Sequence, residues 1–195
     1  MVDDRNKKIL TRVRAKVGKL GTNEIQKEDI YDNANIVVND MLQEMRCVEK
    51  IYTIYLKIGK TSYPVESKNS LLVKKIIPSW DGELKRLTDW ENSKDASGDT
   101  PLYYEWFAKT LKIAPAPNND TDTIEIWAFQ TSQINKIDDL TAPETPESLD
   151  NVLVLGICAE FDPEKFLALY IAERDSKKYL IHNKETANRV PNSTW

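Results

Sequence analysis

Residues 51–65 read IYTIYLKIGKTSYPV, and in this stretch the hydrophobic period of the chain changes from that of a helix to that of a strand. Every second position is apolar, at Tyr52, Ile54, Leu56 and Ile58. Such alternation is typical of a strand with one buried face. Gly59 permits a tight turn, and Tyr63 before Pro64 favours extended backbone. The stretch therefore predicts a β-hairpin in the middle of the chain.

Gly59-Lys60-Thr61 also has the letters that end a phosphate-binding loop. That loop needs a glycine five residues before Gly59 and a helix directly after the threonine. Position 54 is Ile54, and Pro64 stands where the helix should begin. The sequence thus argues against nucleotide binding at this turn.

Two helices are predicted before this stretch. The first covers about residues 5–19 and ends at Leu20-Gly21. The second has a single apolar stripe with acidic residues in its opening turn, which suits a helix N-terminus. The stripe consists of Ile30, Ala34, Val37, Met41, Met45 and Val48.

Strand patterns continue after the hairpin. They cover residues 71–77, 84–88 and 123–129, and a second hairpin tightened around Ala108-Lys109 is predicted over 103–113. Residues 92–100 are polar and predict a surface loop. Helix returns at Thr145-Pro146-Glu147, a typical N-terminal signal, and Asp162-Pro163-Glu164 repeats that signal for a fourth helix.

The predicted fold class is α+β, a four-helix bundle with a β-sheet domain inserted between the second and third helices. Such an insertion is tolerated when its two ends lie close together. The predicted divisions are a helical bundle of residues 1–48 and 145–186, an inserted β-domain of residues 49–135, a linker of residues 136–144 and a C-terminal tail of residues 187–195.

Bulk composition is that of an ordinary globular chain. It has 195 residues, 41% of them hydrophobic and 30% charged, with a net charge of −4. A net negative charge does not favour nucleic-acid binding by the molecule as a whole. The chain opens on charged residues and has no run of 18 apolar residues, so we predict synthesis in the cytoplasm and no membrane partner. Cys47 and Cys158 are predicted to be free thiols.

No residue pattern predicts an enzyme, a cofactor site or a metal site. His182 is the single histidine, and with two isolated cysteines it cannot complete a usual zinc site. Residues 118–122 are rich in oxygen ligands but lack the glycine and distal glutamate of a calcium loop. Four tryptophans could form a stacking platform, although core or subunit-contact roles are favoured: Trp80, Trp90, Trp106 and Trp127.

Charge distribution is the most informative signal. Residues 5–19 carry seven basic groups and no acid, whereas residues 136–164 carry eight acids and one lysine. The two faces either balance each other within one chain or join one subunit to the next, head to tail. We predict an interface that includes Arg5, Lys8, Arg12, Arg14, Lys16 and Lys19.

The tail completes the predicted interface. It reads ANRVPNSTW and has little to bury, so alone it should be disordered. Trp195 and Arg189 are the residue types that anchor such a tail on a partner. Nine extended residues reach about 30 Å, enough to cross onto an adjacent subunit. Folding back on the same bundle is the equally favoured alternative.

The order of these segments resembles the head–tail adaptor, or connector, proteins of tailed bacteriophages over about residues 7–180. The resemblance rests on Leu10-Thr11-Arg12-Val13-Arg14 and on four longer stretches. They are KEDIYDNANIVVNDMLQEM, IYLKIGKTSYPVE, PLYYEWFAKTLKIAPAPNNDTDTIEIWAF and APETPESLDNVLVLGICAEF.

The resemblance implies a structural protein of the virion neck and no enzyme. Such a protein forms a ring, dodecameric in this family, below the portal protein and above a downstream tail or nozzle protein, with packaged DNA passing through the lumen without sequence specificity. Another ring protein of the neck is the alternative within this class. A carbohydrate- or nucleic-acid-binding module that uses the β-domain aromatics is the alternative from another class.

Overall fold

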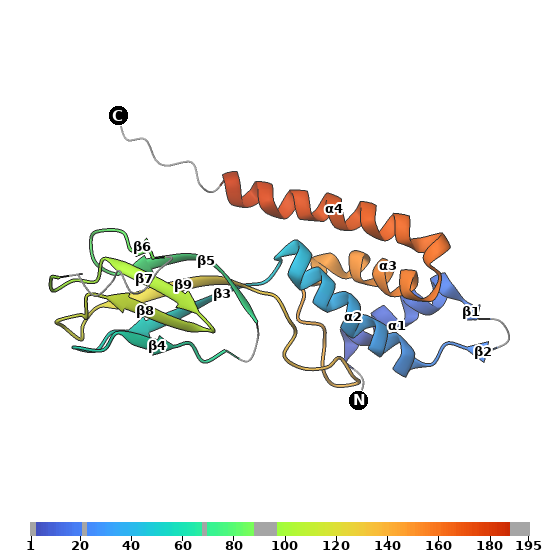
Figure 1. The fold of residues 1–195 in the computed structure, drawn as a ribbon. Coiled ribbons are helices and arrows are strands. Elements are labelled where there is room, and N and C mark those ends of the chain that lie inside the picture. Colours follow the sequence, from blue (N-terminus) through green and yellow to red (C-terminus); the bar gives the residue numbers. More distant parts are fainter. Residues whose placement is uncertain (1–2, 21–22, 68–69, 88–96, 188–195) are drawn as a thin grey trace. The chain divides into compact units, whose positions relative to one another are not determined.

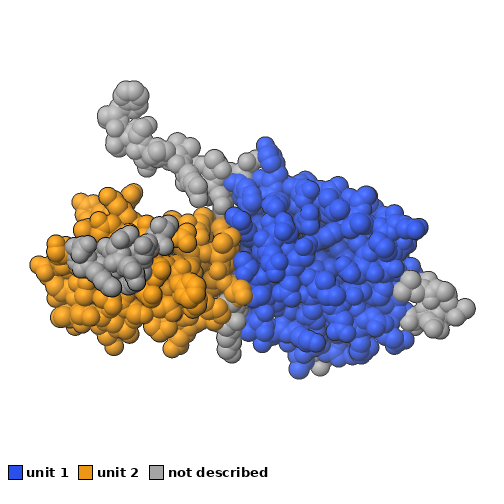
Figure 2. Space-filling view, in the orientation of Figure 1, with its two compact units in different colours: residues 1–48, 130–195 blue, residues 49–129 orange. Residues whose placement is uncertain are grey.

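The computed structural model describes residues 3–20, 23–67, 70–87 and 97–187. The chain is of mixed α and β structure, which confirms the predicted α+β class. It divides into two compact units, Met1–Val48 with Gln130–Trp195 and Glu49–Phe129 (Figure 2). The first unit holds the helices, and the second holds strands β3 to β9.

The helical unit contains α1 (Asp4–Val17), α2 (Lys27–Met45), α3 (Asp150–Phe161) and α4 (Pro163–Ala187). A short antiparallel pair, β1 (Lys19–Leu20) with β2 (Asn23–Glu24), joins α1 to α2. A 3-10 turn, Glu147–Leu149, precedes α3, so the α-helix begins later than the Thr145-Pro146 signal predicted.

Helix α1 begins and ends at local signals. The Asp3 carboxylate accepts hydrogen bonds from the backbone N–H groups of Arg5 and Asn6, which caps the first turn. Gly18 has a φ of 70° and ends the helix. The prediction that Lys19 lies in this helix is therefore wrong. Lys19 belongs to β1 and pairs with Glu24.

The core of the helical unit is built around α3. Every residue from Val152 to Ala159 is buried. A helix that is apolar on all sides needs neighbours on all sides. Helices α1, α2 and α4 pack against it (Figure 1). The apolar stripe predicted for α2 is buried from Ile30 to Met45, as expected.

A glycine allows α2, α3 and α4 to approach closely. A Cβ atom placed on Gly156 would lie 2.4 Å from Cγ1 of Val37 on α2 and 3.0 Å from Cε2 of Tyr170 on α4. Real Cβ contacts are not as short as 2.4 Å, so a side chain at this position would have to displace Val37.

The strand unit contains two sheets. The first has the order β3-β9-β5, formed by Glu49–Tyr55, Thr123–Gln130 and Leu71–Pro78. The second has the order β4-β8-β7-β6, formed by Ser62–Pro64, Thr110–Ala114, Tyr103–Phe107 and Lys85–Arg86. Both sheets contribute to one core of Ile54, Leu56, Tyr63, Val65, Leu111, Ile113, Ile124 and Ile126.

The predicted hairpin at Gly59 is wrong, although the turn exists. β3 pairs with β9 over seven residues, and β4 pairs with β8, so the two strands on either side of Gly59 belong to different sheets. Gly59 has a φ of 72°, and its N–H donates to the Pro117 carbonyl. The Tyr63 hydroxyl bonds to the backbone of Lys57 and Lys60 and fixes this corner. The local pattern showed the strands but not their long-range partners.

The second predicted hairpin is confirmed. β7 and β8 are antiparallel and joined by Ala108-Lys109, both with positive φ, 47° and 62°. Two consecutive positive φ values give the turn the twist that adjacent strands require.

The chain that returns from the strand unit is not a free linker over residues 136–144. It belongs to the helical unit from Gln130 onward, so the strand unit ends at Phe129 rather than at residue 135. The reason is an amide network on α2. The Asn35 carboxamide oxygen accepts from the Ile137 N–H and the Gln133 side chain, each at 2.8 Å. Ile137 is itself buried in the helical core.

Replacing Asn35 by alanine is expected to lower the free energy of unfolding by about 1–3 kcal/mol, because two part-buried donors lose their acceptor. Chemical denaturation measures the change. Asn33→Ala, on the same helix, is the matched control. Within the described residues the Asn33 side chain forms no hydrogen bond, so a loss below about 0.5 kcal/mol is expected there. Equal losses for both variants would contradict the assigned role of Asn35.

Candidate functional site

The outer face of α1 is positively charged. Lys8, Arg14 and Lys16 are exposed, and none forms an ion pair within the described residues. These three side chains are the part of the predicted interface that the structure leaves available to a partner.

Arg5, by contrast, is used inside the helical unit. Its guanidinium donates to the Asp150 carboxylate from Nε at 3.0 Å and to the Pro143 carbonyl at 2.8 Å. Arg12 donates to the Asn151 carboxamide at 2.9 Å. The Arg5 and Arg12 side chains therefore join α1 to the beginning of α3 within one chain.

The acidic segment is divided in the same way. Asp139 bonds to Lys27 Nζ at 2.6 Å and to the Tyr31 hydroxyl, and these bonds lower the pKa of Asp139. Asp150 pairs with Arg5. Glu160 and Glu164 remain exposed where α3 gives way to α4. Exposed acidic side chains therefore remain at the corner between α3 and α4 and, with Glu147, in the 3-10 turn before α3.

The side chains of the remaining predicted interface residues are not described by the structure. Arg189 and Trp195 lie outside the described residues, as does Trp90, and the side chain of Lys19 is not described.

Helix α4 carries a feature that the sequence analysis did not identify. Phe166 and Tyr170 are buried, while Leu167, Leu169 and Ile171 are 46%, 53% and 40% exposed. The residues between Phe166 and Ala172 include no charged side chain. The sequence signal for this feature is the uncharged run from Phe166 to Ala172, which covers more of the helix surface than one buried face can use.

Polar bonds hold α4 against α2. The Tyr170 hydroxyl bonds to the Asp40 carboxylate, and Arg174 Nη1 lies 3.4 Å from the same group. Lys178 and Glu44 form a second pair at 3.3 Å. Burial and the Asp40 hydrogen bond raise the pKa of Tyr170. The hydroxyl therefore stays protonated at neutral pH and acts as a donor.

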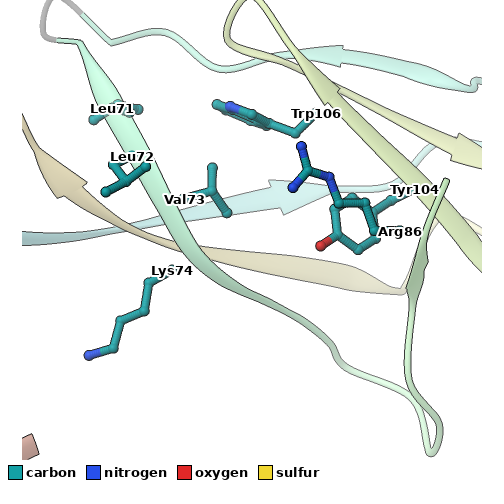
Figure 3. Close-up of a pocket in the computed structure, with 7 residues that line it drawn as sticks. All are labelled: Leu71, Leu72, Val73, Lys74, Arg86, Tyr104 and Trp106. Carbon is teal, nitrogen blue, oxygen red and sulfur yellow. The ribbon is translucent and has the colours of Figure 1, made fainter. Parts of the chain in front are cut away.

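The strand unit has a hollow of about 250 Å³. Figure 3 shows it between β5 and strands β6 and β7, with the Arg86, Tyr104 and Trp106 side chains gathered opposite Val73. Arg86 is exposed, whereas Tyr104 and Trp106 pack partly into the core.

The other described tryptophans do not extend this hollow into a stacking platform. Trp80 packs against the strand core. Trp127 lies under Lys75, with Nζ 3.8 Å from the ring centroid, and its Nε1 donates to Glu125. Because Ile126 is buried, the alternation of β9 places Trp127 on the outer face of its sheet. Trp106 and Trp127 therefore serve different surfaces.

Within the described residues, no three His, Cys, Asp or Glu side chains are grouped in a way that could hold a metal ion. Cys158 is buried, and burial raises the pKa of its thiol to about 11. Cys47 is partly buried, and desolvation likewise raises its pKa to about 11.

In the part of the chain that the structure describes, no helix combines the length and the apolar character needed to cross a membrane.

The chain was also compared with known proteins. No protein-family model matches it, and no curated protein sequence matches it significantly.

Proposed function

We propose that the protein is a structural virion protein of a tailed bacteriophage, a head–tail adaptor of the neck that forms a dodecameric ring below the portal protein. In this proposal the helical unit is a four-helix bundle that carries residues 49–129 as an insertion. The role is mechanical and needs no catalytic group.

The supporting observation is the pair of oppositely charged surfaces on the helical unit. Lys8, Arg14 and Lys16 on α1 form no ion pair within the described residues. Glu160 and Glu164 are exposed on a different part of the same unit. Two different patches that complement each other produce a head-to-tail contact, and such a contact closes into a ring when the rotation permits.

The proposed surroundings follow from the resemblance of the sequence to adaptor proteins. The ring joins the portal above to a downstream tail or nozzle protein below, and packaged DNA passes through its lumen without sequence specificity. The chain is made in the host cytoplasm and ends in the virion neck. Native mass measurement of the protein with portal present tests this role, since a discrete ring is expected and a persistent monomer would contradict it.

The charge contribution has its own test. Replacing Lys8, Arg14 and Lys16 together by glutamine is expected to weaken ring assembly, because the attraction to the acidic neighbour is removed. Raising the salt concentration from about 0.1 M to 1 M shortens the Debye length from about 10 Å to 3 Å. The higher salt should therefore also weaken ring assembly of the unmodified protein. Light scattering after size-exclusion chromatography measures both effects.

A control variant changes the same number of charges on the strand unit. Lys50, Lys57 and Lys85 are exposed, and their replacement by glutamine is expected to leave assembly unchanged. If both triple variants assemble equally well, the α1 face does not contribute to the ring.

A further inference from the structure

The exposed apolar surface of α4 calls for a partner. We define the α4 ridge as Leu167, Ala168, Leu169, Ile171 and Ala172, all of which are exposed. Scattered exposed apolar residues are ordinary, but contiguous ones mark an interaction surface. The ridge is contiguous because side chains three and four positions apart are neighbours on a helix surface, as Leu167 is to Ile171 and Leu169 is to Ala172.

The ridge continues onto α2. The pairs Asp40–Arg174 and Glu44–Lys178 fix the register of the two helices. Ile36 lies one turn before Asp40 on α2, and it is 57% exposed. Because Asp40 lies beside Arg174, the same register places Ile36 level with Tyr170, next to the ridge. The apolar surface thus includes both helices, and its end at the start of α4 carries the exposed Glu160 and Glu164 together with one exposed base, Lys165.

A complementary surface exists on α1. A groove of about 370 Å³ is lined by Lys7, Lys8, Thr11, Arg12 and Asp150. The stems of lysine and arginine are aliphatic, while their charged ends remain in water. The groove therefore has an aliphatic floor and a rim in which Lys8 and Arg12 are basic, while Lys7 is paired with the exposed Asp4. The Asp150 carboxylate is already paired with Arg5.

One chain cannot join its own two surfaces. Helices α1 and α4 both pack on α3, and Figure 1 shows α3 between them. The groove of one copy is open to the ridge of another. An apolar ridge with a mainly acidic end fits an aliphatic floor with a mainly basic rim.

From this complementarity we infer that the α4 ridge of one copy docks into the α1 groove of the next copy. The contact is heterologous, since ridge and groove are different surfaces of the same chain. The inference rests on the proposed ring and names the two surfaces that build it. Apolar burial at the ridge supplies the affinity, and the charges set the orientation.

Cross-linking between two variants that each carry one added cysteine tests the contact. Chains carrying Thr11→Cys are mixed with chains carrying Leu167→Cys, and a short bifunctional maleimide is added. A heterodimer is expected from the mixture, and neither variant alone should cross-link. The unmodified chain is the control for Cys47 and Cys158, whose raised pKa values keep them mainly as unreactive thiols.

A second control moves one cysteine away from the groove. Thr53 is exposed on β3, so Thr53→Cys mixed with Leu167→Cys should give no heterodimer if docking is specific. Cross-linking of Leu167→Cys with itself would show a two-fold α4 contact and overturn the inference. Absence of the Thr11–Leu167 product at every protein concentration would also overturn it.

The same experiment separates this inference from the proposed ring. If closed rings form but Thr11→Cys and Leu167→Cys do not cross-link, the proposed ring stands and this interface is rejected. If cross-linked open chains form, the interface stands and the closed ring is rejected. A further outcome concerns residues 188–195 of the same chain. If deleting them makes the cysteine of Leu167→Cys react faster with maleimide in a monomer, these residues cover the ridge and the inference is overturned.

Charge reversal gives an independent readout. Lys8→Glu alone and Glu164→Lys alone are each expected to weaken self-association by up to about fivefold, the range of exposed ion pairs. In a mixture, both kinds of contact between the two variants join opposite charges, so association between them should be restored. Equal weakening in the mixture and in the single variants would show that these two residues do not meet.

Discussion

Replacing Leu153 by alanine is expected to lower the free energy of unfolding by about 2–5 kcal/mol. Leu153 is fully buried in α3, where α1, α2 and α4 surround it. The loss combines the transfer free energy of the removed methyl groups with the cost of the cavity that they leave. Chemical denaturation followed by the helical circular dichroism signal measures it.

Leu180→Ala is the matched control, because Leu180 is half exposed on α4 of the same unit. Its expected loss is below about 0.5 kcal/mol, as for surface sites in general. A loss of that small size at Leu153 would contradict the placement of α3 at the centre of the helical core.

Gly156→Ala is expected to destabilise the protein by about 1–3 kcal/mol, the usual cost of overpacking. This direction is diagnostic, since glycine to alanine within an exposed helix stabilises by about 1 kcal/mol. Here the new methyl group would meet Val37 at 2.4 Å, and a β-branched side chain has little rotamer freedom to move away. Thermal or chemical denaturation of the variant gives the sign directly.

A double-mutant cycle identifies the cause. Val37→Ala removes the clashing methyl groups, so the combined variant with Gly156→Ala should lose less than the sum of the two single losses. If the two losses of unfolding free energy are strictly additive, contact with Val37 is not the reason that position 156 needs glycine.

The sequence predicted the helices better than the sheets. The periods of Ile30 to Met45 and of Leu149 to Phe161 are local, and the structure confirms a helix over most of each stretch. The turn at Ala108-Lys109 was also visible because a hairpin is local. The Gly59 turn was misread because the partners of its two strands, β9 and β8, lie more than 40 residues away in the chain. Local alternation carries no information about such pairing.

The candidate site was predictable only in part. The basic face of α1 follows from composition, but the internal use of Arg5 depends on where Asp150 lies in space. The α4 ridge needs the packing of α2 and α3, since only that packing decides which of its apolar residues are covered. The role of Asn35 was hidden for a similar reason, because a polar helix face looks the same whether it meets water or a returning segment of chain.

The place where the strand unit joins the helical unit has an evolutionary consequence. Glu49 pairs with Phe129, and the Gln130 N–H donates to the Val48 carbonyl at 2.9 Å. The chain thus leaves and returns through one antiparallel rung. A segment whose two ends lie close together is tolerated by its host domain, so we expect that residues 49–129 can be replaced by another segment without unfolding the helices. The surface of the strand unit could then change in evolution while the helical unit keeps its core.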